Sequence, residues 1–194
     1  MTTRHEYRTD RTSVRERFGG VDTPAAIGGM LATLGTLAFL GALIAAGAGN
    51  LDYRLNAIDI DGNLQELEIL TVLIAGLVVL ASGFVGGWVA GRMARFDGAI
   101  NGIASAIWLV ALVAIFAALG AWFGAEYNAF QLAGMPDWFS QITGDDVTAM
   151  AVVGALVAIA ALMAGAALGG NVGEMYHRKV DNAAVTERVV DERP

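Results

Sequence analysis

Hydrophobic and polar positions in this chain form long blocks rather than a short alternation. Four stretches contain no Asp, Glu, Lys, Arg or His, and they cover residues 24–49, 69–91, 99–125 and 147–173. About 20 apolar residues in a helix cross a hydrocarbon layer ~30 Å thick. The pattern therefore predicts an all-α, polytopic membrane protein whose four transmembrane helices form two hairpins.

The polar segments between these stretches define the rest of the organisation. A four-helix transmembrane domain is predicted over 24–173. The segments outside the helices are an N-terminal tail (1–23), a first loop (50–68), a short link (92–98), a second loop (126–146) and a C-terminal tail (174–194). Asp22 stands two residues before Pro24, which is a typical helix start, because Asp can cap the first turn and Pro needs no hydrogen bond there.

The distribution of basic residues predicts the orientation in the membrane. All of them except Arg54 fall in the two tails or in the link 92–98. By the positive-inside rule, both termini and this link are cytoplasmic, and the protein is a multi-pass protein of the plasma membrane. The basic residues that flank the helices and determine this topology are Arg15, Arg17, Arg92, Arg95, Arg178 and Lys179.

Composition and charge agree with this class and exclude others. The chain has 194 residues, of which 56% are hydrophobic and 16% charged, and its mean hydropathy is +0.56. Soluble domains have about 25% charged residues, and a protein of this size could not cover four such helices with polar surface. A net charge of −7 argues against nucleic acid as a partner. The chain has no cysteine, so disulfides and thiolate metal sites are excluded.

Glycines spaced four residues apart suggest where the helices pack. A GxxxGxxxG pattern lies at the end of the second stretch and recurs 82 residues later at the end of the fourth. This spacing places the glycines on one helix face, where another backbone can approach closely, as in a glycine zipper. In a chain rich in Ala and Gly, such spacings also arise by chance. The predicted helix-packing residues are Gly83, Gly87, Gly91, Gly165, Gly169 and Gly173; shorter echoes are Gly41/Ala45/Gly49 and Gly98/Gly102/Ala106.

A tandem duplication would explain this recurrence. Residues 17–20 read Arg-Phe-Gly-Gly before the first helix, and residues 95–98 read Arg-Phe-Asp-Gly before the third. Each half would then be one hairpin, and the two would be parallel repeats related by an axis along the membrane normal. The glycine triplets and these segments recur at different offsets, so the hypothesis also requires an insertion or deletion.

Residues that would support catalysis or metal binding are scarce. No predicted span contains an ionisable residue, whereas pumps and coupled transporters usually need one at depth. Catalytic motifs such as H-E-x-x-H, a P-loop or G-x-S-x-G do not occur. Residues 59–63 begin like a calcium loop, but Leu70 stands where an EF-hand has Glu, so the EF-hand pattern fails. A solvated turn is favoured here, with loose cation binding by the acidic loop as the alternative. We predict no enzymatic activity, no cofactor and no metal.

Three segments resemble a known group of proteins. Residues 86–98 read Gly-Gly-Trp-Val-Ala-Gly-Arg-Met-Ala-Arg-Phe-Asp-Gly, residues 173–181 read Gly-Glu-Met-Tyr-His-Arg-Lys-Val-Asp, and residues 17–22 read Arg-Phe-Gly-Gly-Val-Asp. This combination resembles a family of small four-helix integral membrane proteins of actinobacteria, to which no activity is assigned. The resemblance implies the same topology and a bacterial cell membrane.

Two hypotheses about function follow. The first is a structural or interaction protein that associates in the lipid bilayer with itself, as a homo-oligomer, or with a larger membrane complex. The alternative is a passive channel or small-solute permeation protein formed by an oligomer. A water-filled path needs polar helix faces, and these stretches contain only scattered Thr, Ser and Asn, which favours the first hypothesis.

Overall fold

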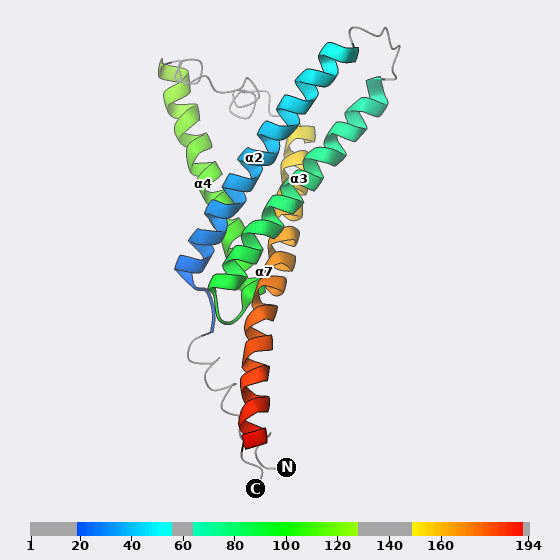
Figure 1. The fold of residues 1–194 in the computed structure, drawn as a ribbon. Coiled ribbons are helices and arrows are strands. Elements are labelled where there is room, and N and C mark those ends of the chain that lie inside the picture. Colours follow the sequence, from blue (N-terminus) through cyan, green and yellow to red (C-terminus); the bar gives the residue numbers. More distant parts are fainter. Residues whose placement is uncertain (1–18, 56–63, 128–148, 192–194) are drawn as a thin grey trace.

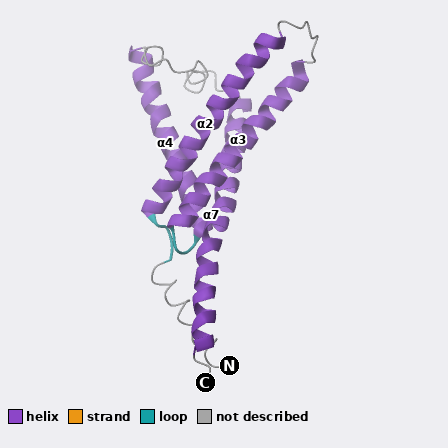
Figure 2. Ribbon diagram, viewed as in Figure 1, coloured by secondary structure: helices purple, strands orange, loops and turns teal. Residues whose placement is uncertain are grey.

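Four long helices make up almost all of the described chain. The computed structural model describes residues 19–55, 64–127 and 149–191. The helices are α2 (Thr23–Leu55), α3 (Leu64–Met93), α4 (Gly98–Tyr127) and α7 (Ala149–Asp191), and a short turn at 94–97 joins α3 to α4 (Figures 1 and 2). Each contains a segment that is long and apolar enough to cross a membrane. The prediction of an all-α protein with four transmembrane helices is confirmed.

The helices continue beyond the apolar stretches that predicted them. α2 extends to Leu55, and α7 continues past Gly173 to Asp191. Residues 174–191 contain neither Gly nor Pro, so no residue stops the helix where the charged sequence begins. The remaining parts of the predicted tails and loops, at 1–18, 56–63, 128–148 and 192–194, lie outside the described residues.

The helices converge at one end of the molecule and diverge at the other (Figure 1). α2 and α4 begin at the end where they converge, whereas α3 ends there and α7 continues past it. We call this the basic end and define it as residues 19–23, 90–98 and 173–180. Four of the residues predicted to determine topology lie at this end, namely Arg92, Arg95, Arg178 and Lys179; Arg15 and Arg17 lie outside the described residues.

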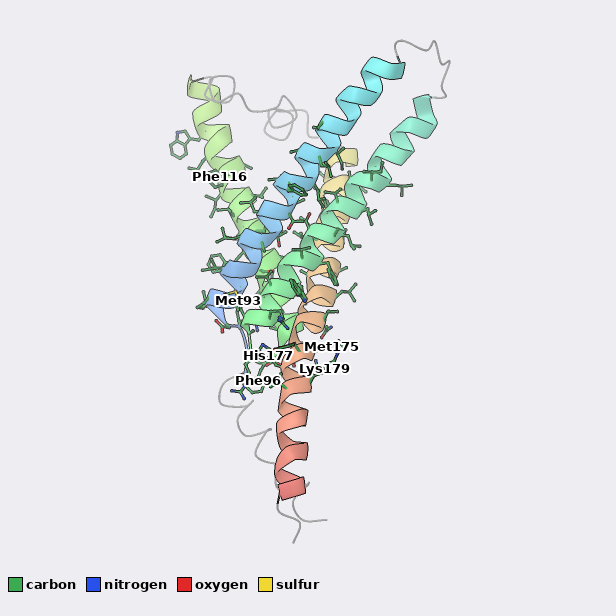
Figure 3. All side chains as sticks on the ribbon, in the orientation of Figure 1. Met93, Phe96, Phe116, Met175, His177 and Lys179 are labelled. Atoms are coloured by element: carbon green, nitrogen blue, oxygen red, sulfur yellow. The ribbon has the colours of Figure 1, made fainter. Side chains whose placement is uncertain are left out.

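Small side chains form the core, in the half of the bundle nearest the basic end. The buried apolar residues are Ala25, Ala26, Ala90, Ala94, Ala104, Ala106, Leu109, Leu162 and Ala166. In the other half, large side chains such as Phe39 and Phe116 are exposed, and Phe116 lies well away from the other helices (Figure 3). Only 11% to 28% of each spanning segment is buried inside the protein. Lipid or another protein must therefore cover most of the apolar surface.

Candidate functional site at the basic end

Both predicted glycine triplets lie in the contact between α3 and α7. A Cβ added to any of these glycines would meet a backbone carbonyl of the other helix, so the two backbones lie in direct contact. The glycines of α3 face α7 in three pairs: Gly83 with Leu162, Gly87 with Ala166, and Gly91 with Gly170. The glycines of α7 face α3 in three more: Gly165 with Leu80, Gly169 with Phe84, and Gly173 with Trp88.

These six pairs obey a local two-fold relation. Gly83 contacts Leu162, and the residues 82 positions away, Gly165 and Leu80, contact each other in the same way. Both helices run toward the basic end, so the local axis lies along their common direction, as parallel repeats would require. A two-fold relation of the whole bundle would exchange α3 with α7 and α2 with α4, so α7 would pack against α2 as α3 packs against α4. The bundle does not show this, because α3 packs against both α2 and α4, whereas α7 packs chiefly against α3 and α4. Duplication therefore stays a prediction.

The other two helices also approach through glycine. On α2, a Cβ at Gly29 would lie 2.7 Å from the carbonyl oxygen of Gly86. On α4, a Cβ at Gly102 would meet the carbonyl oxygen of Ala166, close to the Cα atom of Gly87. Gly29 was not singled out from the sequence, although Ala25, Gly29 and Thr33 have the spacing of four that indicates a face of small residues.

Four polar side chains are fully buried among these helices: Thr33, Ser82, Asn101 and Ser105. The Thr33 hydroxyl donates to the carbonyl of Gly29 (3.0 Å), and the Ser105 hydroxyl donates to that of Gly102 (2.6 Å). The Ser82 hydroxyl has no hydrogen-bond partner among the residues that the structure describes. A buried hydroxyl without a partner costs free energy, so Ser82 differs from the other three.

Asn101 joins three segments of the chain at the basic end. Its amide nitrogen donates to the carbonyl oxygens of Gly20 (3.0 Å) and Phe96 (3.3 Å), and its side-chain oxygen accepts from the backbone N–H of Asp22 (2.7 Å). The carbonyl oxygen of Asp97 in the same turn also lies 3.2 Å from this nitrogen, so one of its two N–H groups is shared between two acceptors. One side chain therefore connects α4 with the residues that precede α2 and with the turn that follows α3.

The two similar sequences that precede α2 and α4 meet at this point. The N–H of Gly20 donates to a carboxylate oxygen of Asp97 (3.0 Å). Gly20 has φ +109° and Asp97 has φ +54°, so both lie in the left-handed region, which Gly favours and Asp tolerates. The carboxylate of Asp22 accepts from the N–H of Ala25 (3.3 Å), which confirms Asp22 as the cap of α2.

α7 is bonded to both ends of the α3–α4 turn. One carboxylate oxygen of Glu174 accepts from the N–H of Gly98 at the start of α4 (2.9 Å), where the helix dipole favours a negative charge. The other accepts from Arg178 (3.1 Å). The Nε2–H of His177 donates to the carbonyl of Arg92 at the end of α3 (2.9 Å), since a carbonyl can only accept. Sequence analysis missed Glu174 and His177, which are the first ionisable residues of α7 after the apolar stretch.

Arg92 is held by aromatic rings. Its guanidinium lies 4.0 Å from the centroid of the Tyr176 ring and 5.9 Å from that of Trp88, which are cation–π distances. Neither Arg92 nor Lys179 forms an ion pair within the described part of the chain. The basic end therefore combines a bonded polar framework with exposed cationic groups.

The three segments that carry the family resemblance meet at the basic end, where segment 86–98 is bonded both to Gly20 and to Glu174 and His177. Among residues 19–55, 64–127 and 149–191, no group of three or more His, Asp or Glu side chains is placed to hold a metal ion. Comparison with protein-family models, with curated proteins and with solved structures gave no match.

Proposed function

We propose that this chain is a non-enzymatic membrane protein of the plasma membrane that associates with further copies of itself or with a larger membrane partner. The observation that supports this is the uneven packing of the bundle. The half near the basic end is closed by backbone contacts at glycine, whereas the other half leaves large apolar side chains exposed on all four helices. The close contacts near the basic end hold the four helices together, and the exposed apolar faces of the other half can pack against further helices.

Open glycines on α2 support association through this helix. A Cβ added to Gly35, Gly41 or Gly47 would have no atom of the described residues within 4 Å. These glycines are therefore not used for packing within the described part of the protein, unlike the six glycines of the two triplets. In lipid, where burial of apolar surface adds little, close approach at small residues is a main source of helix association.

The use made of the buried polar groups supports a non-enzymatic role. Thr33, Asn101 and Ser105 are bonded to the protein's own backbone. The buried residues of the described chain include no ionisable side chain that could exchange a proton or hold an ion at depth. A channel, the alternative function, would need polar groups along a continuous path, and Ser82 is a single buried hydroxyl without a hydrogen-bond partner among the described residues.

The association proposal predicts a selective effect of Leu at Gly41. The larger side chain would keep a neighbouring helix away from α2, so we expect a loss of cross-linked oligomer or co-purified partner of about tenfold, roughly 1.4 kcal/mol. The measurement is cross-linking in intact membranes, followed by purification in mild detergent. The melting temperature of the variant should stay near that of the wild type, because a side chain at Gly41 would meet no atom of the described residues within 4 Å.

Gly154→Leu is the matched control for this experiment, since Gly154 of α7 is equally open. It should leave association unchanged if α2 provides the surface. A wild-type protein that remains monomeric and without partner in membranes would refute the proposal. Selective conductance of the purified protein in liposomes would instead support a channel.

The proposed orientation has its own test. The chain has no cysteine, so single cysteines give an unambiguous signal. Asn63→Cys, in the first predicted outer loop, should react with a membrane-impermeant thiol reagent on intact cells, and Thr9→Cys, in the N-terminal tail, should react only after lysis. Both positions lie outside the described residues. Labelling of Thr9→Cys from outside the cell would reverse the orientation.

A further inference from the structure

The Arg92 side chain forms no hydrogen bond with any residue that the structure describes. It is exposed, and the central carbon of its guanidinium lies over the Tyr176 ring, 4.0 Å from the ring centroid. A guanidinium carries five N–H donors in a planar fork, which suit the oxygen atoms of a phosphate or carboxylate. No residue supplies such oxygen atoms to Arg92, which forms no ion pair within the described part of the chain.

The carboxylates of the basic end are bonded elsewhere. Glu174 is bonded to the N–H of Gly98 and to Arg178, Asp97 to the N–H of Gly20, and Asp22 to the N–H of Ala25. Apart from Arg92, the other titratable groups at this end are Arg95, Tyr176, His177, Arg178 and Lys179. The positive charges of Arg92 and Lys179 are therefore not neutralised within this cluster.

An apolar surface lies beside these two cations on the membrane side. On α7, Leu168, Val172, Met175 and Lys179 follow each other at spacings of four, three and four, which places them on one helix face. The three apolar members are 44% to 57% exposed, and Figure 3 shows Met175 and Lys179 next to each other on α7. On α3, Trp88 is 41% exposed and lies one turn before Arg92.

We propose that Arg92 and Lys179 bind the phosphate group of an anionic phospholipid in the membrane leaflet at the basic end. Tyr176 and Trp88 hold the Arg92 guanidinium at the depth of the headgroups, where amphipathic rings are favoured. The acyl chains lie along the apolar face formed by Leu168, Val172 and Met175. A cation pair above an apolar stripe matches the two parts of a phospholipid, whereas soluble phosphate would use only the cations. The proposal requires membrane insertion but no association with a second protein.

The test is to titrate each probe into the purified full-length protein in neutral detergent. The melting temperature of the protein is measured at each probe concentration. The probes are phosphatidylglycerol, phosphatidylcholine and inorganic phosphate. Phosphatidylglycerol should raise the melting temperature in a saturable manner, and the other two should not. Arg92→Gln and Lys179→Gln should each shift the midpoint of this titration at least tenfold to higher lipid concentration.

Arg178→Gln is the charge-matched control, because Arg178 is paired with Glu174 and lies outside the proposed site. It should leave the midpoint within twofold of the wild type. Tyr176→Leu keeps every charge but removes the ring that positions Arg92, so it should weaken binding as well. Should Arg92→Gln fail to fold, Lys179→Gln and Tyr176→Leu still decide the question.

Three outcomes would overturn the proposal. An equal shift in Arg178→Gln would show that only the overall charge matters. Equal stabilisation by phosphatidylcholine would show that the headgroup charge is not recognised. Equal stabilisation by inorganic phosphate would identify a site for a soluble anion. None of these results depends on the cross-linking that tests association, so the two proposals can fail separately.

Discussion

Leucine at Gly87 should separate α3 from α7 and lower the stability of the bundle by about 3 kcal/mol or more, the upper range for overpacking. A Cβ at this position would meet the backbone of Ala166, and Gly102 of α4 lies close to the same point. Backbone atoms cannot rotate aside as a flexible side chain can. The helices would have to move apart, and each pair of atoms separated would lose about 0.1–0.2 kcal/mol. The measurement is thermal unfolding in detergent, monitored by circular dichroism.

Two further variants decide whether glycine at the contact is the cause. Gly169→Leu should be as damaging as Gly87→Leu, because a Cβ there would meet the backbone at Phe84. Ala75→Leu introduces the same side chain at an exposed position of α3 and should change the melting temperature little. If all three variants melted at the same temperature, the glycine contact could not be what holds α3 to α7.

The fold class could be predicted because the membrane imposes it. In hydrocarbon, each backbone polar group needs a partner within the segment, so a long uncharged stretch must be a helix. The helix ends could not be predicted in the same way. A change from apolar to charged residues marks the membrane surface, and α7 continues past this change from Gly173 to Asp191.

The glycine spacing predicted a helix face but could not predict what lies against it. A period of four places Gly83, Gly87 and Gly91 together, yet the same face could have packed against lipid, another copy or any other helix. The partner depends on how the four helices are arranged, and no local pattern contains that information. Gly41 illustrates the difference, since its spacing is similar and its surroundings are open.

The polar framework of the basic end was the least predictable part. The bonds of Asn101 to Gly20 and Asp22 join residues 81 and 79 positions apart. From the sequence, Asn101 is one polar residue among several in the apolar stretches. The family resemblance pointed to the three segments that meet here, but it did not indicate which hydrogen bonds their side chains form.

Alanine at Asn101 should destabilise the protein by about 2 kcal/mol, because the bonds lost include several to backbone groups with no replacement nearby. The N–H of Asp22 and the carbonyl of Gly20 would both lose their bonds to the side chain. The start of α2 would then be less firmly attached to α4. We expect a lower melting temperature and faster amide hydrogen exchange at the first turn of α2, both measured in detergent.

Ser82→Ala is the appropriate control, since Ser82 is as fully buried as Asn101 but its hydroxyl has no partner. Removing an unbonded buried hydroxyl should leave stability unchanged or raise it slightly. Asn101→Asp keeps the size and the acceptor oxygen but loses the donated bonds to Gly20 and Phe96, so it should resemble Asn101→Ala. If Ser82→Ala and Asn101→Ala changed stability equally, Asn101 would contribute by filling space and not by bonding three segments together. With bonding as the cause, the loss in Asn101→Ala should be confined to the basic end, and exchange in the far half of α4 should stay as in the wild type.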